Sequence, residues 1–143
     1  MVIDREGIDE RLEKIREELD ILKKYLPLPI GSYLSDDEKI HASYHCLQVA
    51  IQCCLDIANL IIAGEDLGRP KDNVEIFRIL SQYDIIPVDV IETYTNLVRF
   101  RNILVHVYLK VDPQEVFETL SAKIEDIERF CAFISKYLEG KPE

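Results

Sequence analysis

The chain has 143 residues, 48% of them hydrophobic, which predicts one globular domain over residues 1–143 and excludes wholesale disorder. Seventeen basic and 27 acidic residues give a formal net charge of -10. This charge disfavours long-range, non-specific attraction to nucleic acid, so we expect no DNA binding and only local contacts to RNA.

The four cysteines have neither the CxxC spacing of redox and metal sites nor the density of a disulfide framework. No signal peptide precedes them, so we expect a reducing, cytoplasmic location. Cys46 and Cys53 are seven residues apart and share a helix face, where we expect them as small buried side chains. The most apolar run, residues 49–63, is interrupted by Gln52, Asp56 and Asn59 and is shorter than the roughly 20 residues of a membrane span. We therefore expect no membrane association.

The first predicted helix covers residues 4–26, and Pro27 and Pro29 end it. Its apolar residues recur at alternating steps of four and three, which is the narrow seam of a helix bundle. The seam is formed by Ile8, Leu12, Ile15, Leu19, Leu22 and Leu26.

A turn containing Gly31 separates this helix from a second, longer one. Ser35 followed three residues later by Glu38 predicts a capping box at its start. The helix then extends to Ile62, with Gly64 as its C-terminal stop. At about 1.5 Å per residue it is roughly 40 Å long, which predicts that it is the central helix of the bundle.

Three polar residues on the second helix are candidates for function. His41 and His45 are four residues apart and could share a metal ion, but a metal site needs a third ligand, and no Glu follows His41 as in the HExxH pattern. We expect surface positions or an interhelical hydrogen bond, and no metal. Asp56, beside the apolar stripe, either pairs locally or pairs with an arginine of residues 99–101.

Two further helices follow a loop at residues 64–73. Asp72 or Asn73 caps a short helix that ends at about Tyr83. Pro87 opens the fourth helix, the third of the long ones, at its first turn, where a missing amide is harmless.

The last helix begins at Asp112-Pro113-Gln114-Glu115, an N-cap followed by a helix-opening proline, and runs to Gly140. Four long helices and one short helix predict an all-α fold, namely an antiparallel four-helix-type bundle with an additional short helix.

Residues 97–110 carry an unusual density of polar side chains among Leu, Ile and Val. Polar groups among apolar neighbours are costly unless they are paired, so such a cluster usually has a function. The polar members are Arg99, Arg101, Asn102, His106, Tyr108 and Lys110.

Helical geometry divides this cluster between faces. Asn102 and His106 are four residues apart and share a face, whereas Arg101 and His106 are separated by roughly 140° around a continuous helix. Alternating apolar and polar residues over 105–111 also suggest that the helix loosens near His106. Either the backbone bends here or a second copy of the chain completes the site.

The residue types suit metal-free RNA cleavage. Arginine offers a fixed fork of donors for phosphate, histidine exchanges a proton near neutral pH, and asparagine can orient either one. The RNA 2′-hydroxyl could then attack the adjacent phosphorus. The alternative from the spacing alone is structural: Arg101 and His106 form an internal hydrogen-bonding pair that joins helices to Asp56 or to a carbonyl.

The sequence R-N-x3-H-x-Y at residues 101–108 resembles the signature of the HEPN superfamily, specifically its HepT-like toxin branch. Residues 50–59, 85–87 and 111–113 are also similar to that branch, so the resemblance covers most of the chain. Asp56 and Asn59 are weaker correspondences. Arg99 is not part of the family pattern.

The resemblance implies an all-helical HEPN-like homodimer in which the two motifs face a shared cleft. It implies the toxin of a type II toxin-antitoxin pair, a metal-independent endoribonuclease without a cofactor, with Arg101 and His106 as catalytic residues and Asn102 and Asp56 in support. The partner would be a minimal nucleotidyltransferase antitoxin of the MntA type, which transfers AMP from ATP onto Tyr108.

The physical effect of such a modification is direct, because attached AMP places bulk and negative charge where RNA phosphate must lie. Arg99 and Lys110 are the candidate RNA-binding cations beside the motif. An alternative from another class is a non-catalytic module that binds a nucleotide or scaffolds the nucleotidyltransferase. A third possibility is a purely structural bundle with a buried polar pair.

Overall fold

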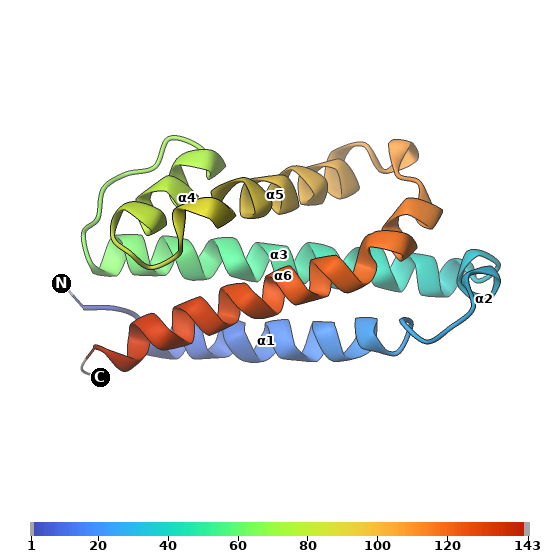
Figure 1. The fold of residues 1–143 in the computed structure, drawn as a ribbon, viewed down its shortest axis with the longest axis horizontal. Helices are drawn as coiled ribbons and strands as arrows, with labels where there is room; N and C mark the ends of the chain where they lie inside the picture. Colours follow the sequence, from blue (N-terminus) through green and yellow to red (C-terminus); the bar gives the residue numbers. More distant parts are fainter. Residues whose placement is uncertain (1, 142–143) are drawn as a thin grey trace.

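A computed structural model describes residues 2–141, and every regular element in this part of the chain is helical (Figure 1), which confirms the all-α prediction. The elements are α1 (Arg5–Lys23), α2 (Ile30–Leu34), α3 (Asp37–Gly64), α4 (Asn73–Gln82), the 3-10 helix η1 (Val88–Val90), α5 (Ile91–His106), the 3-10 helix η2 (Tyr108–Lys110) and α6 (Pro113–Glu139).

The four long helices alternate in direction, as predicted for an antiparallel bundle (Figure 1). The central helix α3 packs against α1, α5 and α6, and α4 lies beside α3 and α5. The described chain begins and ends at one end of the bundle, whereas α2, η2 and the first turns of α3 and α6 lie at the other (Figure 1). The last residues of the predicted polar cluster, which lie on η2, are therefore far from the ends of the described chain.

Helix α1 begins where the Asp4 side chain accepts a hydrogen bond from the Gly7 amide (2.9 Å). It ends at Lys23, three residues before the predicted end, because a residue that precedes a proline is disfavoured in the helical conformation. Leu26 is consequently exposed. The other seam residues point inward: Ile8, Ile15, Leu19 and Leu22 are buried and Leu12 packs against the core.

The predicted turn around Gly31 contains the short helix α2, and α3 has a different cap from the one predicted. Asp36 accepts hydrogen bonds from the backbone amides of Glu38 (3.1 Å) and Lys39 (3.3 Å). Ser35 instead ends α2, and its hydroxyl is turned back towards the Ser32 carbonyl (3.5 Å). The predicted Ser35 capping box is therefore wrong, because Asp36 is placed to reach the free amides first.

Gly64 is the last residue of α3 rather than a stop beyond it. A Cβ atom at this position would lie 2.8 Å from the Cα of Ile3 and 3.0 Å from the carbonyl oxygen of Val2. The glycine is needed because the N-terminal segment crosses α3 here at close range.

The remaining predicted caps are confirmed. Asp72 accepts from the Glu75 amide (2.8 Å) at the start of α4, and Asp112 accepts from the Gln114 amide (3.0 Å) at the start of α6. After Pro87 the first turn is the 3-10 helix η1, which continues directly into α5.

By length and composition α3 could cross a lipid bilayer. Within the bundle, however, 61% of its most apolar stretch is buried, as is usual for the central helix of a helical bundle. Its neighbours therefore cover the apolar stripe, which consists of Leu47, Ala50, Ile51, Cys54, Ile57, Ala58 and Ile61.

Cys46 and Cys53 of α3 are buried, which confirms the prediction, and Cys54 beside them is buried as well. Burial, with a further contribution from Glu18, raises the pKa of Cys46 to about 12. The thiol therefore stays protonated and unreactive at neutral pH.

Candidate functional site

The predicted polar cluster lies at the C-terminal end of α5 and on the turn that follows. Helix α5 ends at His106; Val107 leaves the helical conformation (φ -138°, ψ 44°), and η2 begins at Tyr108. The predicted loosening near His106 is thus confirmed as the end of the helix. It places His106 and Tyr108 on the exposed end of the bundle.

Arg101 and His106 belong to one uninterrupted helix, so no bend brings them together. Their side chains leave the axis about 140° apart. Arg101 is partly buried and its Nε is enclosed, whereas His106 is exposed. Among the described residues neither side chain has a hydrogen bond or ion pair, which argues against the internal structural pair.

Arg99, Asn102 and His106 follow one another at steps of three and four and therefore share a face of α5. Arg99 is exposed and donates a hydrogen bond to the Asn96 side chain (3.2 Å). This face thus presents a guanidinium, an amide and an imidazole in a row towards solvent.

Asp56 lies outside the cluster. Its carboxylate accepts hydrogen bonds from Arg11 Nε (3.3 Å) and from Gln52 Nε2 (2.8 Å). The alternative in which Asp56 pairs with an arginine of residues 99–101 is wrong, because α1 packs along α3 and brings Arg11 to the carboxylate. The supporting role of Asp56 in the site stays a prediction.

Four apolar side chains within three residues of His106 in the sequence are exposed. The exposed fractions are 42% for Ile103, 43% for Val105, 38% for Val107 and 87% for Leu109, and we refer to these four residues as the end patch. Contiguous exposed apolar surface on a soluble domain commonly marks an interaction site. The end patch and His106 together form a surface suited to contact with another molecule.

A groove of about 540 Å³ runs between the first half of α3 and η2, and Tyr108 lies along it. We call it the α3–η2 groove. The two exposed histidines of α3 line it, so their predicted surface positions are confirmed. Its lining also includes Tyr44, Gln48, Leu104 and Leu109. Within residues 2–141 no group of three or more His, Cys, Asp or Glu side chains is arranged to hold a metal ion.

Tyr44 was not singled out from the sequence. Its hydroxyl is buried and has no hydrogen-bond partner in the described chain. Burial, helped by the nearby Tyr33 and Asp112, raises the pKa of Tyr44 to about 12. The hydroxyl therefore keeps its proton and can still donate a hydrogen bond. The i, i+4 spacing of His41 and His45 was the one sequence signal for this surface.

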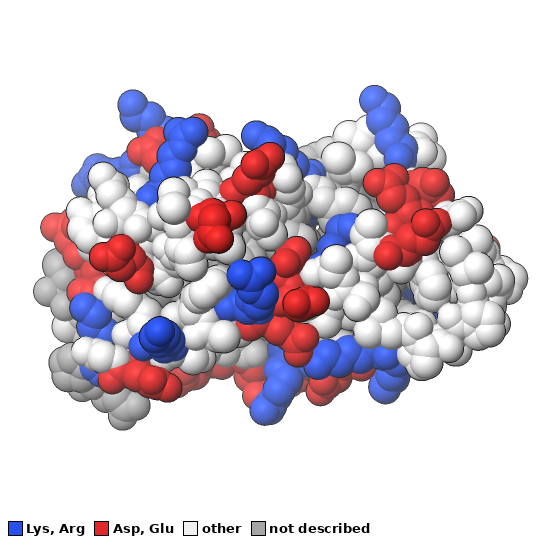
Figure 2. Space-filling model, in the orientation of Figure 1, with Lys and Arg blue, Asp and Glu red and all other residues white. Residues whose placement is uncertain are grey.

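On the face that Figure 2 shows, the basic residues do not form a broad positive surface. Figure 2 shows acidic and basic side chains interspersed over one face, with mostly uncharged surface at the end that holds α2. Lys110 is exposed and shares a small hollow with Asp112, Glu115 and Lys123. Lys123 stands over the ring of Phe100 (4.5 Å), and burial lowers the pKa of its ammonium group.

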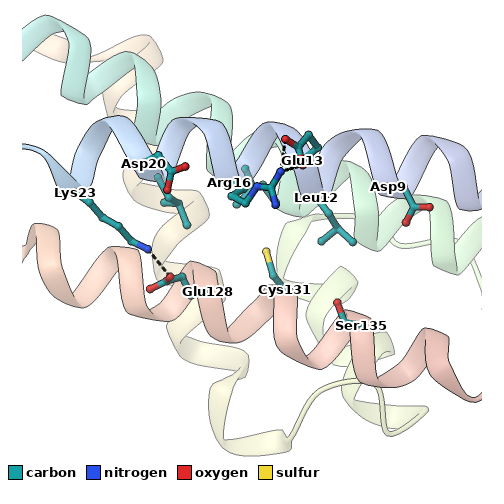
Figure 3. A pocket seen from close by; sticks show the side chains of 11 residues that line it. Asp9, Leu12, Glu13, Arg16, Asp20, Lys23, Glu128, Cys131 and Ser135 are labelled. Carbon is teal, nitrogen blue, oxygen red and sulfur yellow. Dashed lines mark hydrogen bonds and ion pairs between the residues drawn. The ribbon is translucent and has the colours of Figure 1, made fainter.

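A second groove, of about 390 Å³, lies between α1 and α6 (Figure 3). Arg16 pairs there with Glu13, and Lys23 with Glu128 (2.8 Å). Burial raises the pKa of Cys131, which also lines this groove, to about 11. None of the predicted site residues lines the groove, and its two basic side chains, Arg16 and Lys23, are engaged in ion pairs.

The sequence matches the HepT-like family, described as Ribonuclease HepT-like, over residues 15–134. The chain belongs to the HepT-like ribonuclease family. This confirms the family indicated by R-N-x3-H-x-Y at residues 101–108.

Two HepT relatives are similar in sequence. The chain is 31% identical over 131 residues to the tRNA nuclease HepT of Aphanizomenon flos-aquae, an alignment that covers 92% of this chain and 89% of the relative. It is 32% identical over 88 residues to the mRNA nuclease HepT of Shewanella oneidensis, covering 62% of this chain and 66% of that one.

The fold also matches a solved HepT-like structure. That structure is the tri-AMPylated HEPN toxin of Shewanella oneidensis in complex with its MNT antitoxin, with a TM-score of 0.82 and 24% identity. The match covers 91% of this chain and 97% of the toxin chain. It confirms the HEPN-like fold.

Proposed function

We propose that this HepT-like protein is a metal-independent endoribonuclease, acting in the cytoplasm as the toxin of a type II toxin-antitoxin pair. The main observation behind the proposal is that the side chains of Arg101 and His106 have no hydrogen bond or ion pair in the described chain. Both residues lie in the last two turns of α5, at the exposed end of the bundle. The relatives are called tRNA and mRNA nucleases, which supports RNA as the substrate.

The active unit is a homodimer in this proposal. Two end patches packed against each other would bury the apolar side chains that surround His106. Because Arg101 points about 140° away from His106 on the same helix, a cleft between two copies would pair Arg101 of one with His106 of the other.

The chemistry needs only the RNA and these side chains. His106 takes the proton of the ribose 2′-hydroxyl as its oxygen bonds to the adjacent phosphorus. The bond from phosphorus to the 5′-oxygen breaks, and a protonated group returns a proton to that oxygen. Arg101 stabilises the charge that develops on the phosphoryl oxygens. The products are a 2′,3′-cyclic phosphate and a 5′-hydroxyl end.

The other polar residues of the cluster have supporting roles. Asn102, on the same face as His106, orients the imidazole or the phosphate. Arg99 and Lys110 are exposed beside the motif and bind RNA phosphates locally. The net charge of -10 confines RNA binding to this region.

Tyr108 is the residue through which the activity is turned off. It is 64% exposed and two residues from His106, so a second enzyme can reach its hydroxyl. We propose that an MntA-type nucleotidyltransferase transfers AMP to it, and that the added bulk and charge repel RNA. A similar solved toxin is tri-AMPylated and bound to an MNT antitoxin, which supports this assignment.

The test is cleavage of RNA by the purified protein in EDTA. The wild-type chain should cut and leave cyclic phosphate ends, and His106→Ala should lower the rate by about 10²–10⁴ without loss of fold. Asn59→Ala, an exposed change on α3 outside the groove and the cluster, is the matched control. Undiminished cleavage by His106→Ala contradicts the mechanism. Intact RNA with a bound nucleotidyltransferase would favour the non-catalytic module.

A further inference from the structure

We propose that the α3–η2 groove is the binding site for the adenylyl group attached to Tyr108, with His41 and His45 holding its phosphate. This inference rests on the proposed modification of Tyr108 and adds a noncovalent site for the group once it is attached. The groove would make AMPylation a fixed, protected state of the toxin rather than a mobile appendage.

A nucleotide attached to Tyr108 is within reach of the groove. AMPylation joins the phenol oxygen of Tyr108 to the α-phosphorus of ATP and releases pyrophosphate and one proton. The nucleotide is then tethered to a side chain that itself lines the groove. The groove volume of about 540 Å³ falls within the range of roughly 300–1,000 Å³ that is usual for small-molecule sites.

Polar groups that can bind a nucleotide follow one another along α3. His41, His45 and Gln48 occupy successive turns, so they lie on one face of the helix and span about 10 Å. Both histidines are exposed and can donate N–H groups to a phosphate oxygen. The Gln48 amide, one turn further, can both donate to and accept from the edge of a purine.

Tyr44 carries an unused hydrogen-bond donor close to the groove. The residue lines the groove on the turn of α3 between the two histidines, and its hydroxyl is buried behind that lining without a partner among the described residues. A buried polar group without a partner costs free energy, which a ligand in the groove could recover by accepting its hydrogen bond.

Charge and apolar surface set the orientation of the nucleotide. Asp37, one turn before His41, is the one carboxylate in the groove lining that the structure describes, so it keeps the phosphate towards the histidines. Leu104, Leu109 and Val111 form apolar wall against which the adenine can pack.

The experiment compares how fast a phosphodiesterase removes AMP from Tyr108. The protein is co-expressed with an MntA-type nucleotidyltransferase, and intact mass with peptide mapping establishes the adenylyl group on Tyr108. Three variants are prepared in the same way: the double change His41→Ala/His45→Ala, the single change Tyr44→Phe, and the control Asn59→Ala. Circular dichroism verifies the fold of each.

Release should be about tenfold faster from His41→Ala/His45→Ala, since hydrogen bonds to a charged phosphate are lost, and faster to a smaller extent from Tyr44→Phe. Asn59→Ala should match the wild type. Equal release rates from wild type and the double variant overturn the inference and leave the proposed function standing. Absence of AMP from Tyr108 overturns the proposed regulation and this inference together. Loss of RNA cleavage by the unmodified double variant, with unchanged AMP release, identifies the groove as an RNA subsite instead.

Discussion

The interior of the bundle and the end of α5 use the same residue types in opposite ways. Within the bundle, apolar residues at helical spacing are buried on neighbouring helices, and Phe130 and Ile134 of α6 are fully enclosed. Around His106, apolar residues face solvent, and Leu109 is 87% exposed. The difference teaches that the interior is complete in one chain, whereas the end patch is left uncovered, as the proposed homodimer requires.

Polar groups differ between the two regions in the same way. Along α3, Asp56 is satisfied by Arg11 and Gln52. In the motif, Arg101 and His106 have no side-chain partner within the described chain. Uncommitted polar groups beside uncovered apolar groups are typical of a site that a substrate and a partner complete.

The largest expected effect on stability comes from the interior. Phe130→Ala should lower the free energy of unfolding by about 3–5 kcal/mol, because it leaves a cavity in a closely packed core. Leu109→Ala should change it by less than about 0.5 kcal/mol in the monomer. Urea denaturation at low protein concentration measures both free energies of unfolding. Similar losses of stability in the two variants would contradict the difference between the interior and the end patch.

The next effect concerns association. Leu109→Asp should raise the dimer dissociation constant by about 10–100-fold, since burying a leucine is worth roughly 1.5–3 kcal/mol and a buried carboxylate is unfavourable. Val88→Asp places the same charge at an exposed apolar position on η1 and should leave association unchanged. Sedimentation velocity over a dilution series measures the constants. Equal dissociation constants for Leu109→Asp and the wild type would show that the end patch is not part of the dimer interface.

A smaller effect tests the close approach at the other end of the bundle. Gly64→Ala should cost about 1–3 kcal/mol, because its Cβ would lie 2.8 Å from the Ile3 Cα. Gly31→Ala is the control: a Cβ there meets nothing within 4 Å, and alanine favours the helical conformation of α2. Thermal melts compare the two, and a neutral Gly64→Ala would contradict the packing of the N-terminal segment on α3.

The smallest effect belongs to the Asp56 pair. A double-mutant cycle of Arg11→Ala and Asp56→Ala should give a coupling energy of about 0.2–1 kcal/mol, since both side chains are about a third exposed. A parallel cycle of Arg101→Ala with Asp56→Ala should give none. A coupling energy in the second cycle and none in the first would show that Asp56 interacts with Arg101 rather than with Arg11.

The long helices could be predicted from the sequence wherever apolar residues recur at helical spacing or an aspartate caps the first turn. The apolar periodicities of α1, α3 and α6 and the aspartate caps at residues 72 and 112 were sufficient to predict those helices. The five-residue helix α2 was missed because it is shorter than two turns and gives no periodic signal. Ser35 and Asp36 are both residue types that cap helices, and only the backbone conformation decides that Asp36 is the cap of α3.

Only the part of the candidate site that lies within one continuous segment of the chain could be predicted from the sequence. The motif at residues 101–108 located the catalytic candidates and the exposed Tyr108. The partner of Asp56 and the α3–η2 groove were not predictable, because they depend on helices distant in sequence. Tyr44 and Tyr108, for example, meet in one groove only after α3 and η2 pack at the same end of the bundle.

The central claim is that one copy supplies Arg101 and the other His106. The direct test mixes inactive Arg101→Ala protein with inactive His106→Ala protein under conditions in which subunits exchange, and measures RNA cleavage. Each mixed dimer then retains one site with both residues, so activity should return to about a quarter of the wild-type rate in an equal mixture. Cleavage that stays at the level of the separate variants, with mixed dimers present by mass spectrometry, would contradict a site shared between two copies.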